Sequence, residues 1–134
     1  MKTLFELKTH LPFDTDLLER LQKTASIMLK NAEQGQYTQV LILVSSTEKE
    51  YSAVIKNVLS EEHPEEKALL EELKANHDTT IDYILCMWQD GCIDIPSWAF
   101  RKMLCSLDPK NADALLFVMT GNGVSAVRLA NTMK

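Results

Sequence analysis

The sequence has little of what membrane spans, long linkers and disulfide frameworks require. It contains four Gly and four Pro, too few for a long linker or a disordered tail. No apolar run approaches the roughly 20 residues that span a bilayer, and residues 1–8 lack the apolar stretch of a secretory signal. Cys86, Cys92 and Cys105 are an odd number without paired spacing, which indicates a reducing compartment. We therefore expect a cytoplasmic protein without membrane contact.

Dense positive charge is also missing. The chain has 14 Lys and Arg against 19 Asp and Glu, which gives a net charge of −5 and a pI of about 5.2. Nucleic-acid-binding proteins normally present a basic patch to the phosphates, so we expect no nucleic-acid partner. The composition is otherwise that of an ordinary globular protein, 46% hydrophobic and 25% charged. A chain of 134 residues is predicted to form one domain, residues 1–134.

Apolar positions at helical spacing predict three helices. The first begins near Asp14, and its apolar residues recur at steps of three and four until Gly35. The second begins at Pro64, because proline suits the first helical position and two glutamates follow at the positive end of the helix dipole. The third starts at Pro96 after a cap at Asp94.

Apolar runs predict strands between these helices. Residues 40–44 are five consecutive apolar residues rich in β-branching, typical of a strand covered on both faces. Residues 81–87, 114–119 and 124–129 are predicted as further strands, the last two joined by a turn at residues 120–123. Helices that alternate with apolar strands indicate a three-layer α/β fold.

The segment from residue 46 to residue 59 fits two structures. Its apolar residues fall at helical spacing, and Thr47 with Glu50 could form a capping box, so periodicity alone favours a helix. Residues 51–55 could equally be the second strand of a hairpin that turns over residues 47–50.

Three stretches carry a recognisable pattern. Residues 63–70 are His-Pro-Glu-Glu-Lys-Ala-Leu-Leu, residues 96–101 are Pro-Ser-Trp-Ala-Phe-Arg, and residues 123–133 form a strand that ends in Leu-Ala-Asn-Thr-Met. In this order and spacing they resemble the cytidine deaminase family. That family has a His/Cys-Ala-Glu helix start, then Pro-Cys-x-x-Cys-Arg, then a closing strand with a Leu-Ala/Gly-x-Leu-Leu ending. The Tyr-Thr at residues 37–38 is similar to the family's Tyr-Ser, so the likeness runs from about residue 37 to the end.

The resemblance implies an α/β fold, a three-layer α/β/α sandwich around a mixed five-stranded sheet. It also implies a hairpin for the ambiguous segment, because the Tyr-Ser-Ala-Val at residues 51–54 is similar to the Tyr-x-Gly-Val of the family's second strand. We therefore predict a strand there, against the local periodicity. A helix between residues 47 and 59 would favour an unrelated α/β domain with a mainly parallel sheet.

The positions of the family's zinc site have changed in this sequence. In the family, zinc held by one His or Cys and two Cys activates a water that attacks the pyrimidine at C4, and a glutamate shuttles the proton. By resemblance, His63 stands at the first ligand, Glu65 at the proton shuttle, and Ser97 and Phe100 at the two cysteines. A hydroxyl is a poor zinc ligand and a phenyl ring is none. We therefore expect no metal and no cofactor, with Glu65 as a catalytic vestige.

Each of these residues also has a simpler interpretation. His63 could be a cap or a surface residue, and Glu65 could only complement the helix dipole. Trp98 could line a pocket or pack in the core or an interface, and Phe100 could fill the space of the metal. We keep His63, Ser97, Phe100 and Trp98 as candidate substrate-binding residues.

Together these patterns predict a non-catalytic protein of the cytidine deaminase fold that binds a small nucleoside-like ligand or acts as an interaction partner. The resemblance implies a homodimer or homotetramer. One alternative is an active zinc-dependent nucleoside deaminase or hydrolase with an atypical ligand set, for which Cys92 is the nearest spare thiol. Another is an unrelated α/β interaction domain. Because Ser97 and Phe100 stand where the family has its two cysteines, a non-catalytic protein is favoured over an enzyme.

Overall fold

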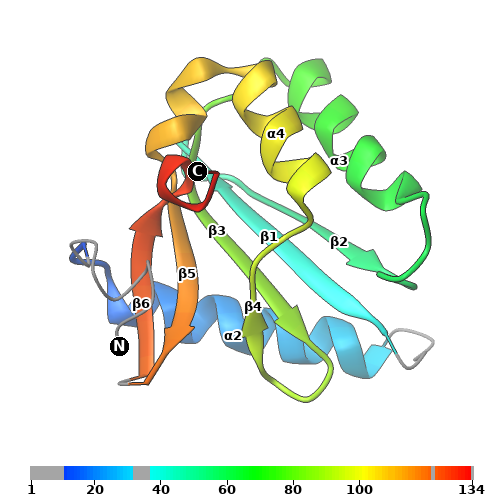
Figure 1. The fold of residues 1–134 in the computed structure, drawn as a ribbon, viewed down its shortest axis with the longest axis vertical. Coiled ribbons are helices and arrows are strands. Elements are labelled where there is room, and N and C mark those ends of the chain that lie inside the picture. Colours follow the sequence, from blue (N-terminus) through cyan, green and yellow to red (C-terminus); the bar gives the residue numbers. More distant parts are fainter. Residues whose placement is uncertain (1–10, 32–36, 122, 134) are drawn as a thin grey trace.

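A computed structural model describes residues 11–31, 37–121 and 123–133, which form one sheet with helices on both faces (Figure 1). In these ranges, no helix is both long enough and apolar enough to cross a bilayer. The elements in chain order are α2 (Thr15–Asn31), β1 (Gln39–Ser45), β2 (Glu50–Ile55), α3 (Pro64–Ala75), β3 (Ile81–Trp88), β4 (Ile93–Asp94), α4 (Trp98–Leu107), the 3₁₀ helix η1 (Pro109–Asp113), β5 (Leu115–Thr120), β6 (Gly123–Arg128) and the 3₁₀ helix η2 (Leu129–Thr132).

The sheet is mixed. Its strand order is β2-β1-β3-β5-β6, with β4 paired to β3 outside this path. The pair β3 and β5 is parallel, and the other pairs are antiparallel. The α/β class is confirmed, and the predicted count of five strands is one too low. The extra strand, β4, has only two residues, too few for a sequence pattern to indicate.

Two apolar clusters cover the two faces of the sheet. On β1, Val40 and Ile42 pack with α2, whereas Leu41 and Leu43 pack with α3 and α4. Successive residues of a strand point to opposite faces, so a strand between two helix layers must be apolar at every position. Figure 1 shows the result, with α2 on one side of the sheet and α3 and α4 on the other.

The ambiguous segment forms a hairpin, as the resemblance implied. β2 pairs antiparallel with β1 over six consecutive positions, and the turn places Glu48 at a φ of 67°. Tyr51 and Ile55 are buried against α3 while Ser52 is exposed. Pairing with β1 overrides the helical periodicity because burial against the sheet outweighs local propensity. The parallel, helix-containing alternative is therefore wrong.

The start of α4 differs from its prediction. Asp94 lies in β4, where its carboxylate accepts hydrogen bonds from the Trp88 indole and from the backbone N–H of Ile95. The cap is Ser97, whose hydroxyl accepts from the N–H of Phe100 at 3.1 Å. The predicted end of the first helix at Gly35 lies outside the described residues, as does one residue of the predicted turn at residues 120–123.

Candidate functional site

The helices α3 and α4 lie side by side, and a buried carboxylate connects their first turns. His63 precedes α3 without a side-chain cap bond, and Ser97 precedes α4. Glu66, in the first turn of α3, is 2% exposed. Its Oε1 lies 3.0 Å from Nδ1 of His63, and the Ser97 hydroxyl lies 3.2 Å from each of its oxygens. We call these three residues the Glu66 network.

Both ring nitrogens of His63 are engaged. Nε2 lies 2.9 Å from the carbonyl oxygen of Val58, which can only accept, so Nε2 carries a proton. Nδ1 faces the Glu66 carboxylate, which accepts a hydrogen bond from Nδ1–H when the ring is protonated. Burial alone would lower the pKa of His63, but the bonds to Glu66 and Val58 raise it above 6.5. The two hydrogen bonds thus favour the protonated form of the ring.

The two positions that resemble zinc-binding cysteines hold groups with other tasks. The Ser97 hydroxyl caps α4 and bonds to Glu66. Phe100 is fully buried and belongs to the apolar cluster between the sheet and the helices α3 and α4. A cap hydroxyl satisfies an otherwise unpaired N–H of the first helical turn. Both side chains therefore have structural roles.

These residues do not fit a zinc ion. Zinc needs about four ligands, with thiolate, imidazole or carboxylate supplied by the protein. Here both imidazole nitrogens already have hydrogen-bond partners, and the other two positions are a hydroxyl and a phenyl ring. Among the described residues, no three His, Cys, Asp or Glu side chains gather in a way that could hold a metal. Metal content itself stays a prediction.

Glu65, at the position that resembles the family's proton shuttle, lies apart from the network. It is half-buried, and its Oε2 accepts a hydrogen bond from the backbone N–H of Lys56 at 3.3 Å. Of the two glutamates that the sequence places at the positive end of the helix dipole, Glu66 is the buried one. Helical spacing could have identified Glu66, because it precedes the buried Leu70 and Leu73 by four and seven residues. A vestigial role for Glu65 stays a prediction.

Trp98 is on the surface. It exposes 52% of its area, so the interpretation as a core residue is wrong. The guanidinium carbon of Arg101 lies 5.5 Å from the centre of its ring. Arg101 also donates to the carbonyls of Pro96 and Thr132 at 2.9 and 2.8 Å. It thus ties the start of α4 to η2.

The three cysteines are not converging ligands. Cys86 is fully buried on β3 and donates to Oε1 of Gln39 at 3.2 Å, and burial raises the pKa of its thiol far above the ordinary value. Cys92 is exposed, and its hydrogen bond with Asp90 raises its pKa. Cys105 is partly buried, and burial raises its pKa also. Thiolates are the reactive and metal-binding form, so each environment works against that chemistry.

A second buried carboxylate lies at the turn between β1 and β2. Oδ2 of Asp78 accepts hydrogen bonds from the hydroxyls of Ser45, Thr47 and Tyr51, each at 2.8 Å. Burial would raise the pKa of Asp78, and the three hydroxyls together lower it below 3.8. Sequence reasoning missed this cluster, since its four members are spread over 34 positions and share no spacing. It fixes the hairpin turn to the segment that follows α3.

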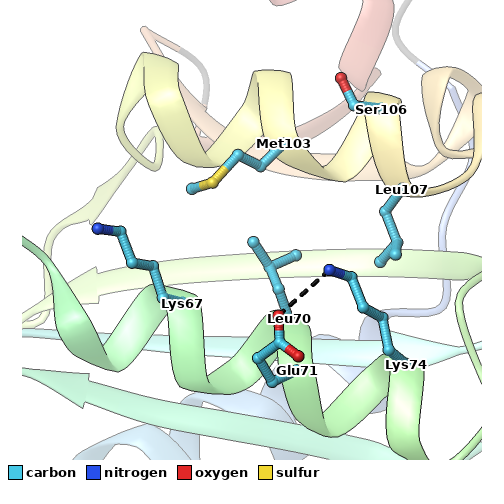
Figure 2. Close-up of a pocket in the computed structure, with 7 residues that line it drawn as sticks. All are labelled: Lys67, Leu70, Glu71, Lys74, Met103, Ser106 and Leu107. Atoms are coloured by element: carbon cyan, nitrogen blue, oxygen red, sulfur yellow. Dashed lines mark hydrogen bonds and ion pairs between the residues drawn. The ribbon is translucent and has the colours of Figure 1, made fainter.

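A groove of about 540 Å³ lies between α3 and α4 (Figure 2). Lys74 forms an ion pair with Glu71 at 3.2 Å along its wall. None of the four candidate substrate-binding residues lines it. The groove and the Glu66 network are thus separate features of one helix pair. The lining residues are Lys67, Leu70, Glu71 and Lys74 of α3 and Met103, Ser106 and Leu107 of α4.

Solved structures of several cytidine deaminases have a similar arrangement of strands and helices. The enzyme from Mycobacterium leprae superposes with a TM-score of 0.58 and 19% identity, over 87% of this chain and 96% of that one. This chain has a cytidine deaminase-like fold. The Mycobacterium tuberculosis enzyme has a TM-score of 0.60 at 12% identity, over 90% of this chain and 94% of its own. For the Burkholderia pseudomallei enzyme the values are 0.58 and 16%, over 84% and 93%.

No protein-family model matches the sequence, and no curated protein matches it either. At these identities the likeness is one of fold. A cytidine deaminase-like fold can carry different functions, so function must be argued from the site.

Proposed function

We propose that this chain acts by binding and has no zinc-dependent deaminase activity. The observation that carries the proposal is the Glu66 network. At the positions that resemble the family's ligands, the His63 nitrogens, the Ser97 hydroxyl and the Phe100 ring are all engaged in bonds or packing within the chain. Groups so engaged cannot hold a metal or activate a water without losing these partners.

Metal analysis and a cytidine assay test this proposal. We expect protein purified from zinc-supplemented medium to hold far less than about one zinc per chain, and to release no ammonia from cytidine. A titration with cytidine, followed by calorimetry, measures binding separately from turnover. A stoichiometric zinc that is lost in the His63→Ala, Cys92→Ala double variant would overturn the proposal.

The binding face that we propose surrounds the Glu66 network. Trp98 follows Ser97, Leu59 follows Val58, and the N–H of Val58 donates to the carbonyl of Tyr37 at 3.0 Å. Tyr37, Leu59 and Trp98, the apolar rim, are among the few large apolar residues that the described chain exposes, at 39%, 66% and 52%. Trp and Tyr are enriched at the energetic centres of interfaces. A second copy of the chain is the partner that we propose for this rim.

The oligomeric state of Trp98→Ala tests the rim. We expect the wild type to sediment as a homodimer or homotetramer. The dissociation constant of the Trp98→Ala assembly should be about tenfold higher than that of the wild type, or more. Met119→Ala is the matched control, because Met119 exposes the same 52% and lies on β5. A monomeric wild type would contradict the proposal, and so would an unchanged assembly in Trp98→Ala. A change of cytidine binding in Trp98→Ala, without a change of assembly, would favour a nucleoside partner.

A further inference from the structure

The two edges of the sheet differ in what covers them. Along β6, the N–H of Leu11 donates to the carbonyl of Ala126 at 3.0 Å, so the segment before α2 bridges to this edge. At the other edge, β2 pairs with β1, and no other part of the described chain pairs with it. Figure 1 shows β2 at the outer margin of the sheet, beneath α3. An uncovered edge strand is a template for another strand.

The backbone of β2 presents its free hydrogen-bonding groups outward at alternate residues. The N–H of Ser45 donates to the carbonyl of Lys49, which makes this the first hydrogen-bonded pair of the hairpin. Pairs alternate along an antiparallel ladder, so Tyr51, Ala53 and Ile55 bond to β1. Glu50, Ser52 and Val54 therefore point their N–H and C=O groups away from the sheet. The register has no bulge, and β2 contains no proline to block addition.

A groove of about 640 Å³ accompanies this edge, between β2 and α3. The residues that line it include Ala53, Ala68 and Ala75, whose short side chains leave space beside the strand. Its walls carry three carboxylates, Glu65, Glu71 and Glu72. Glu71 pairs with Lys74, whereas Glu72 has no ion pair among the described residues. Short side chains and carboxylates therefore both line the groove.

We propose that the β2 edge binds an extended, basic segment of a partner protein as an added strand. Main-chain bonds to Ser52 and Val54 would hold the segment, and alternate lysine or arginine side chains would reach the carboxylates of α3. A second copy of this chain is a poor occupant, because pairing β2 with β2 would bring two sets of Glu65, Glu71 and Glu72 together. Like charges held opposite each other oppose association.

Binding of a defined peptide tests the proposal. The probe is a fluorescein-labelled hexapeptide of alternating lysine and valine, measured by anisotropy against the full chain. We expect saturable binding, and none by a peptide of alternating glutamate and valine. Ser52→Pro removes an outward N–H without touching the ladder to β1, so the dissociation constant should rise about tenfold or more. Ser52→Ala keeps that N–H and is expected to bind as the wild type does, whereas Glu72→Lys should weaken binding.

Amide hydrogen exchange keeps the test decisive if Ser52→Pro does not fold. Addition of the lysine-valine peptide should protect the outward amides of Ser52 and Val54, while those of Tyr51 and Ala53 are already protected by β1. The proposal is overturned by peptide binding that leaves Ser52 and Val54 unprotected, by equal affinity in Ser52→Pro, or by self-association through this edge. Trp98→Ala should leave peptide binding intact, which separates this surface from the apolar rim.

Discussion

Replacing Glu66 by alanine is expected to lower the free energy of unfolding by roughly 3 kcal/mol, because it removes one partner of a buried charged pair. The carboxylate is 2% exposed and accepts from both His63 and Ser97. Without it, the His63 ring keeps its bond to the Val58 carbonyl but loses its carboxylate partner, and the Ser97 hydroxyl loses its acceptor. Urea denaturation at neutral pH measures the effect.

Glu65→Ala is the matched control for this prediction. Glu65 is the neighbouring carboxylate on the same helix, but it is half-buried and bonds only to the N–H of Lys56 in the part of the chain that is described. Its loss should change stability by no more than about 0.5 kcal/mol. Glu66→Gln should also lower the pKa of His63, measured by NMR of the ring protons. Equal effects of Glu65→Ala and Glu66→Ala would contradict the network.

The same pair predicts how stability depends on pH. The pKa of His63 is raised above 6.5 in the folded chain, so the folded state binds the proton more tightly than the unfolded state. The contribution of this pair to the free energy of unfolding is fully present below pH 6.5. It is lost as the pH rises through the raised pKa of His63. The stability difference between the wild type and Glu66→Gln should therefore shrink toward alkaline pH.

Asp78→Ala is expected to lower the free energy of unfolding by a similar amount, roughly 3 kcal/mol. Three hydroxyls donate to one buried oxygen of Asp78, and two of their owners, Ser45 and Tyr51, are buried. Removing the acceptor leaves these donors without their partner in a water-poor site. Asp82→Ala, on the exposed side of β3, is the control and should change stability little.

Acid titration gives this second prediction a distinct signature. The pKa of Asp78 is lowered below 3.8 in the folded chain, so the unfolded state binds the proton more tightly. The contribution of the Asp78 carboxylate to the free energy of unfolding is fully present above pH 3.8. It is lost as the pH falls through the lowered pKa of Asp78. Thermal unfolding of wild type and Asp78→Ala should therefore converge in strong acid. A gap between them that stays constant down to that range would show that the carboxylate's charge has no role.

Local patterns were sufficient for most of the fold. The five apolar residues at 40–44 predicted a strand covered on both faces, and β1 is fully buried between two helix layers. The segment 46–59 shows where such patterns stop. Its spacing favoured a helix, and only the comparison of motifs indicated the hairpin that β2 forms. Periodicity describes one segment at a time, whereas strand pairing depends on a partner distant in the sequence.

The sequence predicted the place of the candidate site correctly, but it did not predict which residue connects its two sides. The sequence indicated that the starts of the helices after His63 and Ser97 would matter, and the structure joins these two side chains. It did not indicate that Glu66, and not Glu65, makes the connection. Helix rotation decides which of two adjacent glutamates faces inward, and the apolar stripe through Leu70 and Leu73 sets that rotation.

The sequence by itself determined the order of the helices and of every strand except the two-residue β4, the net negative charge, and the presence of Ser97 and Phe100 at the positions that resemble the family's cysteines. The tertiary structure alone decided that a carboxylate would connect His63 with Ser97, and that three hydroxyls would gather on Asp78. It also decided that β2 would have an uncovered edge. Residue identity is a local property, but a buried hydrogen-bond network exists only after packing brings distant segments together and excludes water.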